Sequence, residues 1–116
     1  MANPNIVNVA TINGKTDVFA LTTTETNLVT AAADTVYKIN SIIVSNIDGT
    51  NAADVTIKYN DGSNDRAIAS TISVPADSSL NVIDKNTGFY LEENEIIKGT
   101  ASANSDLECL ISYEII

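Results

Sequence analysis

The sequence predicts a single all-β domain, an antiparallel β-sandwich or jelly roll. First, the 116 residues include 15 Ile, 9 Val and 13 Thr, residue types that fit a pleated sheet. Second, 14 Asn and repeated Asn-Gly, Asp-Gly and Pro-Ala-Asp steps divide the chain into short segments, as tight turns do. Third, several segments alternate between apolar and polar residues. One domain is expected over 6–116, with an N-terminal arm over 1–5.

The first two strands are expected over 6–12 and 15–21. Between them lies Asn13-Gly14, a residue pair that suits a two-residue type I′ turn because both positions of that turn need a positive φ. The sequence therefore predicts that the domain begins with a β-hairpin.

The segment from Glu25 to Ala33 is the one candidate for a helix. Its threonine-rich beginning, 22–24 and Thr26, opposes a helix because β-branched side chains lose χ1 freedom there. A loop followed by a short strand over 27–30 is therefore expected.

A long strand is expected over 35–46. Its apolar residues fall on both faces, with Val36, Ile42 and Val44 on one face and Tyr37, Ile39 and Ile43 on the other. This pattern predicts a central strand, or a strand bent by a β-bulge near Asn40-Ser41.

The remaining strands are expected over 54–60, 66–74, 80–84, 88–91, 96–103 and 107–115. The last of them alternates most clearly, with Leu107, Cys109, Ile111, Tyr113 and Ile115 on one face. In 54–60, Val55, Ile57 and Tyr59 are expected to face inward. A slip of one residue would bury Lys58, so the pairing of this strand should be tightly specified.

The residue types argue against catalysis and against zinc binding. The chain has no His and one Cys, so it lacks the residues of a His-dependent triad or of a Cys/His zinc site. Cys109 is expected on the apolar face of a strand, where a thiol is a small core side chain. We therefore expect neither enzyme activity nor a cofactor or metal. Two oxygen-rich loops, 48–54 and 61–65, leave calcium as an alternative, although neither has EF-hand spacing.

The charge of the chain bears on its partners. A net charge of −9 repels phosphate backbones, so no nucleic-acid partner is expected. The acids are dispersed except at Glu92, Glu93 and Glu95, and a solvated surface is their expected role. No apolar run reaches the length of a signal peptide core or a membrane span. We therefore expect synthesis in a cytoplasm and no membrane partner.

Several stretches carry a family resemblance. Residues 90–114, the opening segments 5–9 and 12–16, and the middle segment 43–50 resemble small virion structural proteins of tailed bacteriophages, particularly marine and cyanobacterial phages. In such proteins one turn often reads Leu-x-x-Gly-Asp, whereas here it reads Leu91-Glu92-Glu93-Asn94-Glu95. Asn94 can adopt the left-handed conformation that Gly would supply. The resemblance implies a β-sandwich or jelly roll that assembles, commonly as a trimer, on a capsid or along a tail.

The expected function is that of a capsid decoration (cement) protein on the virion exterior, which stabilises the head by bridging capsid subunits. Its expected partners are the major capsid protein and copies of itself in a homotrimer. The expected contact residues are Asn3, Pro4, Asn5, Ile6, Val7, Ile115 and Ile116, which alternatively belong to an edge strand of the sandwich itself.

Two alternative functions remain at this point. A tail, baseplate or fibre component involved in host attachment would show exposed aromatic residues or a groove at one end of the sandwich. A sugar- or calcium-binding β-sandwich module would be stabilised thermally by its ligand. The low aromatic content, two Phe and four Tyr without Trp, argues against sugar binding.

Overall fold

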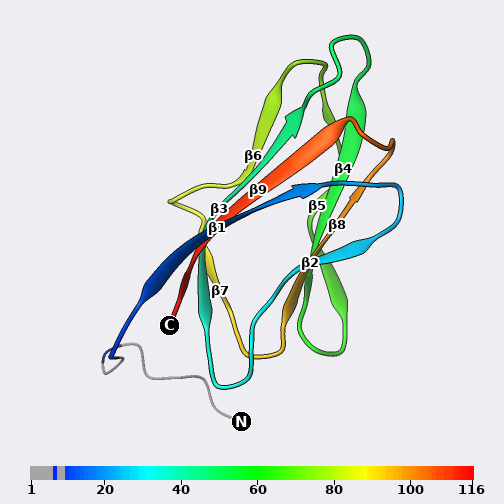
Figure 1. The fold of residues 1–116 in the computed structure, drawn as a ribbon. Coiled ribbons are helices and arrows are strands. Elements are labelled where there is room, and N and C mark those ends of the chain that lie inside the picture. The colour runs from blue at the N-terminus through cyan, green and yellow to red at the C-terminus, as the bar shows by residue number, and fades with distance from the viewer. Residues whose placement is uncertain (1–6, 8–9) are drawn as a thin grey trace.

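Two antiparallel sheets pack face to face in a computed structural model that describes residues 7 and 10–116 (Figure 1). The strands of this part of the chain are β1 (Asn13–Ala20), β2 (Thr26–Thr30), β3 (Tyr37–Asn46), β4 (Ala53–Asn60), β5 (Asp65–Val74), β6 (Ser79–Ile83), β7 (Phe89–Leu91), β8 (Ile96–Ala101) and β9 (Leu107–Ile115). Sheet A has the order β1-β9-β3-β6, and β7 also pairs with β3. Sheet B has the order β2-β8-β4-β5. The predicted all-β sandwich is confirmed.

The core between the sheets is built from the inward residues of both layers. Its largest fully buried side chains are Leu21, Ile39, Ile42, Val44, Val55, Ile57, Val74, Leu91, Ile97, Leu107, Cys109 and Ile111. The alternation predicted for β9 and β4 is confirmed, because the side chains expected to face inward are the buried or half-buried ones. Burial of this continuous apolar layer is the main stabilising contribution to the fold.

The predicted bulge in β3 is confirmed. The pairing of β3 with β9 shifts register between Ile39 and Ser41. The extra residue moves the alternation by one, so Ile39 and Ile42 are both fully buried although the sequence pattern placed them on opposite faces. The predicted central position of β3 is also confirmed, because β3 pairs with β9, β6 and β7.

The predicted first hairpin is wrong. Asn13 and Gly14 lie inside β1, opposite Ile115 and Glu114 of β9, and neither has a positive φ. Residues 7 and 10–12, the described part of the predicted strand 6–12, are not in a strand. The long-range ladder to β9 outweighs the local turn preference, and Asn and Gly tolerate extended backbone as well as turns.

The other turns and strands agree with the sequence. Strand ends lie within two residues of the expected positions, and 25–33 forms β2 with flanking loop. Asn94 is left-handed, with φ 65°, as the turn around it requires. No helix in the described residues is long and apolar enough to cross a bilayer.

Asn46, at the end of β3, is the one buried polar side chain among the described residues. Its Nδ2 donates to the carbonyl oxygens of Asn51 at 3.0 Å and Val74 at 2.9 Å. Its Oδ1 accepts from the backbone N–H of Asp48 at 2.9 Å. A single side chain therefore joins the end of β3, the loop that follows it and the end of β5.

Candidate functional site

An apolar groove of about 390 Å³ lies where the β5 edge of sheet B approaches β6 and β7 of sheet A. We call it the aromatic groove, and it is lined by Tyr59, Arg66, Ala67, Ile68, Ile83, Phe89 and Tyr90. Its lining residues come from four strands, so the groove exists only after the two sheets have packed together.

Two aromatic rings are held rigidly in this groove. Tyr59 and Phe89 meet edge to face, with ring centroids 5.6 Å apart. The Tyr59 hydroxyl donates to the carboxylate of Glu95, which also accepts the backbone N–H of Glu92 at 2.8 Å. Burial, followed by the contact with Glu95, raises the pKa of Tyr59, so its hydroxyl stays protonated. Tyr90, by contrast, is 43% exposed.

The chemistry of the aromatic groove suits protein side chains. Arg66, the only arginine of the sequence, is its one charged lining residue. The lining residues include no carboxylate, thiol or imidazole that could act as a nucleophile or a general base. Tyrosine and arginine around an apolar recess are the residue types enriched where partner proteins bind most strongly.

A more polar pocket of about 550 Å³ lies beside the β3 bulge. It is lined by Lys38, Asn40, Ser41, Lys85, Gly88 and Glu114. A Cβ on Gly88 would lie 2.6 Å from the carbonyl oxygen of Ile39, so only glycine permits this close approach to β3. The Asn40 amide donates to Glu114 at 3.3 Å. This pocket contains both charge signs and favours no single ligand class.

The predicted contact residues lie in different surroundings. Asn3, Pro4, Asn5 and Ile6 lie outside the described residues, and Val7 is 86% exposed. Ile115 lies in β9, opposite both Asn13 and Tyr37, and packs against the core. Ile116 exchanges backbone hydrogen bonds with Val36 at 2.9 and 3.3 Å. Ile115 and Ile116 therefore already make contacts within this chain, Ile115 in sheet A and Ile116 with Val36.

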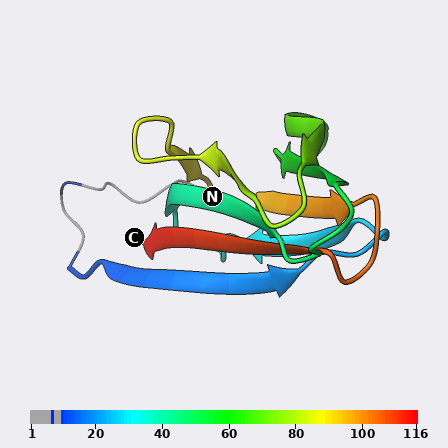
Figure 2. The same ribbon diagram turned by 90° about the horizontal axis from the view of Figure 1, so that it is seen from above.

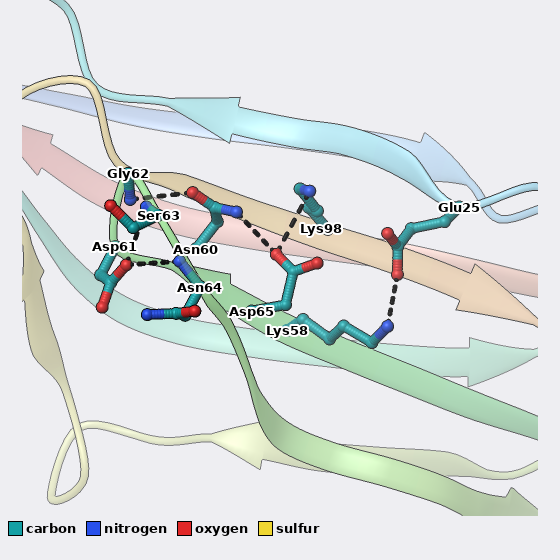
Figure 3. Close-up of polar contacts among 9 residues, drawn as sticks. All are labelled: Glu25, Lys58, Asn60, Asp61, Gly62, Ser63, Asn64, Asp65 and Lys98. Carbon is teal, nitrogen blue, oxygen red and sulfur yellow. Dashed lines mark hydrogen bonds and ion pairs between the residues drawn. The ribbon is translucent and has the colours of Figure 1, made fainter.

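The oxygen-rich loop 61–65 is a hydrogen-bonded turn (Figure 3). Asp61 accepts the backbone N–H groups of Asn64 at 2.8 Å and Ser63 at 2.9 Å, which lower its pKa in that order. The Asn60 side chain accepts the N–H of Gly62 at 2.8 Å. The loop oxygens that make these bonds are thus the acceptors that the turn itself requires.

The loop 48–54 is organised in the same way. Asp48 accepts the backbone N–H groups of Thr50 at 2.8 Å and Asn51 at 3.2 Å, and both bonds lower its pKa. Within residues 7 and 10–116, no three or more Asp, Glu, His or Cys side chains are grouped so that they could hold a metal ion. In both loops the aspartate at the start accepts backbone N–H groups of its own loop.

The outer face of sheet B carries paired charges (Figure 3). Lys58 and Lys98 lie directly opposite each other on β4 and β8, an arrangement that destabilises a sheet when it is not compensated. Glu25 lies 2.8 Å from Lys58 and raises its pKa through a hydrogen bond and its charge. Asp65 lies 3.2 Å from Lys98 and also accepts from Asn60 at 2.7 Å. Each lysine of this face therefore has its own carboxylate.

The acidic group of the sequence has structural roles that the sequence did not reveal. Glu95 holds Tyr59 and caps the turn that starts at Glu92. Glu93 accepts the backbone N–H of Asp34 at 2.8 Å, where the backbone is left-handed with φ 62°. Tyr59 and Asp34 are distant from these glutamates in sequence, which is why the acidic group resembled a solvated surface.

Cys109 is fully buried in β9, as predicted. Burial raises the pKa of its thiol to about 12. A thiol in this state is a poor nucleophile, because the thiolate is the reactive form.

The comparisons with known proteins support the fold. No protein-family model and no curated protein match the sequence. One solved structure similar to this chain is described as "Bacillus endospore appendages form a novel family of disulfide-linked pili". The two chains are 15% identical and superpose with a TM-score of 0.53, over 90% of this chain and 85% of the other. At this identity the similarity establishes a shared β-sandwich fold and no shared function.

Proposed function

We propose that this chain is a structural protein of a virion, most specifically a capsid decoration protein that binds the major capsid protein on the outside of the head. The observation that carries the proposal is the aromatic groove, an apolar recess between the β5 edge of sheet B and strands β6 and β7 of sheet A. The resemblance of residues 90–114 and of the opening and middle segments to phage virion proteins supplies the partner.

The groove suggests how such binding would work. Tyr59 and Phe89 form a fixed apolar surface, and the exposed Tyr90 can cover an inserted side chain. An apolar side chain of a capsid subunit would fill the recess, because burying one such side chain contributes about 1.5–3 kcal/mol. The net charge of −9 keeps the rest of the surface solvated and mutually repelling. Each bound copy adds interface that capsid subunits must lose before they separate.

A tail, baseplate or fibre component is the second candidate. That function predicts exposed aromatic residues or a groove at one end of the sandwich, and Tyr90 of the aromatic groove, at 43% exposure, favours it. The two candidates differ in copy number, since a decoration protein accompanies the capsid subunits and an attachment component occurs a few times per particle. They also differ in partner, which is the capsid protein or a host receptor.

An appendage subunit linked by disulfides, the description given to the structural neighbour, fits this chain less well. The one cysteine of this chain, Cys109, is fully buried in the central strand β9, and burial raises its pKa to about 12. A disulfide between folded copies would require β9 to leave the core. We therefore base the proposal on non-covalent contacts.

Quantitative mass spectrometry of purified phage particles tests the proposed location. A copy number equal to that of the major capsid protein, or to a simple fraction of it, is the expected result. A few copies per particle would support the attachment component, and absence from the particle would overturn the virion proposal.

A matched pair of variants tests the groove. Arg66→Glu reverses the one charge of the groove lining, and Lys85→Glu makes the same charge change at an exposed position outside the groove. We expect Arg66→Glu to bind capsids stripped of this protein at least tenfold more weakly than wild type, while Lys85→Glu binds as wild type does. Equal binding by both variants would exclude the groove as the contact.

A further inference from the structure

β1 is a long and regular edge strand. Among the described residues it pairs with β9 alone, and it lies at the outer side of sheet A (Figure 2). Its ladder with β9 runs from Asn13↔Ile115 to Ala20↔Glu108 without a register shift. An edge of this kind presents a straight row of backbone N–H and C=O groups, which is a template for another strand.

The other sheet edges have the features by which proteins prevent such pairing. β2 and β6 are five residues long, and each has a register shift. β7 has three residues. β5 is longer, but its pairing with β4 shifts twice and Thr71 has a φ of 50°. Short strands and bulges blunt an edge, and β1 has neither. Its charged residues, Lys15 and Asp17, are what would oppose pairing, unless the second strand places opposite charges against them.

An apolar row continues from the exposed Val18 of β1 to half-buried residues of the next two strands. Val18 is 65% exposed, and it lies opposite Leu110 of β9, which in turn lies opposite Ile43 of β3. This row crosses the outer face of sheet A, in contrast to the paired charges on the outer face of sheet B. The β1 side of sheet A is therefore the more suitable surface for a neighbour.

We propose that β1 pairs antiparallel with β1 of a second copy of this chain, about a two-fold axis through Thr16, so that the two A sheets form one continuous sheet. The contact is isologous, and a two-fold axis closes it at two copies. This dimer replaces the homotrimer that the family resemblance implied, and it goes beyond the proposed function without depending on it.

Charge complementarity selects this register. An axis through Lys15 would place two lysines opposite each other, and an axis through Asp17 would place two aspartates opposite each other, which destabilises a strand pair. An axis through Thr16 places each Lys15 opposite Asp17 of the second copy. No other antiparallel register of two β1 strands brings these two opposite charges together.

The environment of these residues supports the same register. Asp17 is held in position by the Tyr113 hydroxyl, which donates to it at 2.6 Å, and it already lies 3.7 Å from Lys15. In the proposed pairing Val18 lies opposite Gly14 of the second copy. Space around Gly14 is open, because a Cβ there would meet no atom within 4 Å. The exposed Val18 side chain would therefore face the second strand without a clash.

Reversing the charge of Lys15 or of Asp17 tests the contact. Sedimentation velocity over a concentration series measures how strongly each variant dimerises. Wild type is expected to form dimers, whereas Lys15→Glu and Asp17→Lys, each alone, are expected to weaken dimerisation at least tenfold because like charges then face each other. Mixing the two variants should restore a dimer, since each introduced charge faces an opposite one. Lys85→Glu, with the same charge change away from β1, should dimerise as wild type does, and thermal melting verifies that each variant is folded.

Cysteine cross-linking tests the register. Thr16→Cys places two thiols across the axis, within the range of Cα separations that a disulfide spans. Val18→Cys places them about 13 Å apart along the strands. Under mild oxidation with oxidised glutathione, we expect a reducible dimer of Thr16→Cys and none of Val18→Cys. A monomeric or trimeric wild type, failure of the mixed variants to dimerise, or equal cross-linking at both positions would overturn the proposal.

Discussion

Replacement of Asn46 by alanine should destabilise the fold far more than its location at a strand end suggests. The substitution removes three hydrogen bonds, two donated to Asn51 and Val74 and one accepted from Asp48. A typical hydrogen bond contributes about 1 kcal/mol net, so a loss of about 3 kcal/mol in the free energy of unfolding is expected. With an unfolding entropy of about 2.1 cal/mol/K per residue, this loss lowers the Tm by about 12 °C for a chain of this length.

Urea titration and thermal melting, both followed by circular dichroism, measure this effect. Asn86→Ala is the matched control, because Asn86 is exposed, and it should change the stability by less than about 0.5 kcal/mol. If Asn46→Ala lost less than about 1 kcal/mol, or no more than the control, the buried amide would not join the three segments as described.

Three further predictions follow from buried groups. A Cβ on Gly99 would lie 2.7 Å from Leu28 and 3.0 Å from Leu21, so Gly99→Ala should cost about 1–3 kcal/mol by overpacking, and unchanged urea stability would contradict this packing. Cys109 should react with a thiol reagent only after unfolding, and stoichiometric labelling of the native protein would contradict its burial. Burial raises the pKa of Tyr113 in the folded state. Its contribution to the free energy of unfolding is therefore complete below pH ~10, where an unfolded tyrosine is still protonated, and decreases as the pH rises further. Tyr113→Phe should reduce the decrease in Tm at alkaline pH, and an unchanged decrease would contradict this role.

The strand content could be predicted because each strand depends on a short local pattern. The alternation of apolar and polar residues in 107–115 specified one buried face. In 35–46 the apolar residues fell on both faces, and this pattern indicated the bulge. The pair Asn13-Gly14 misled because its turn preference is local, whereas its actual partner in β9 lies at the other end of the sequence. A preference within two residues is weaker than eight ladder pairs that also bury a core face.

The candidate site could not be predicted in the same way. Tyr59 and Phe89 are 30 positions apart, and only the packing of sheet A against sheet B brings their rings together. The sequence showed few aromatic residues but not that three of them line one groove. The acidic residues at 92–95 were visible, but Tyr59 and Asp34, which donate to Glu95 and Glu93, belong to a strand and a loop far away in the sequence.

The position of β9 between β1 and β3 has a consequence for biosynthesis. Because the ribosome makes β9 after the other eight strands of the described residues, sheet A cannot close until β9 has been synthesised. Until then the nascent polypeptide exposes the inner edges of β1 and β3, and neither strand has its principal partner. Closure of non-local pairs is slow and leaves unpaired edges open to aggregation, so chaperone protection during synthesis would matter most in this interval.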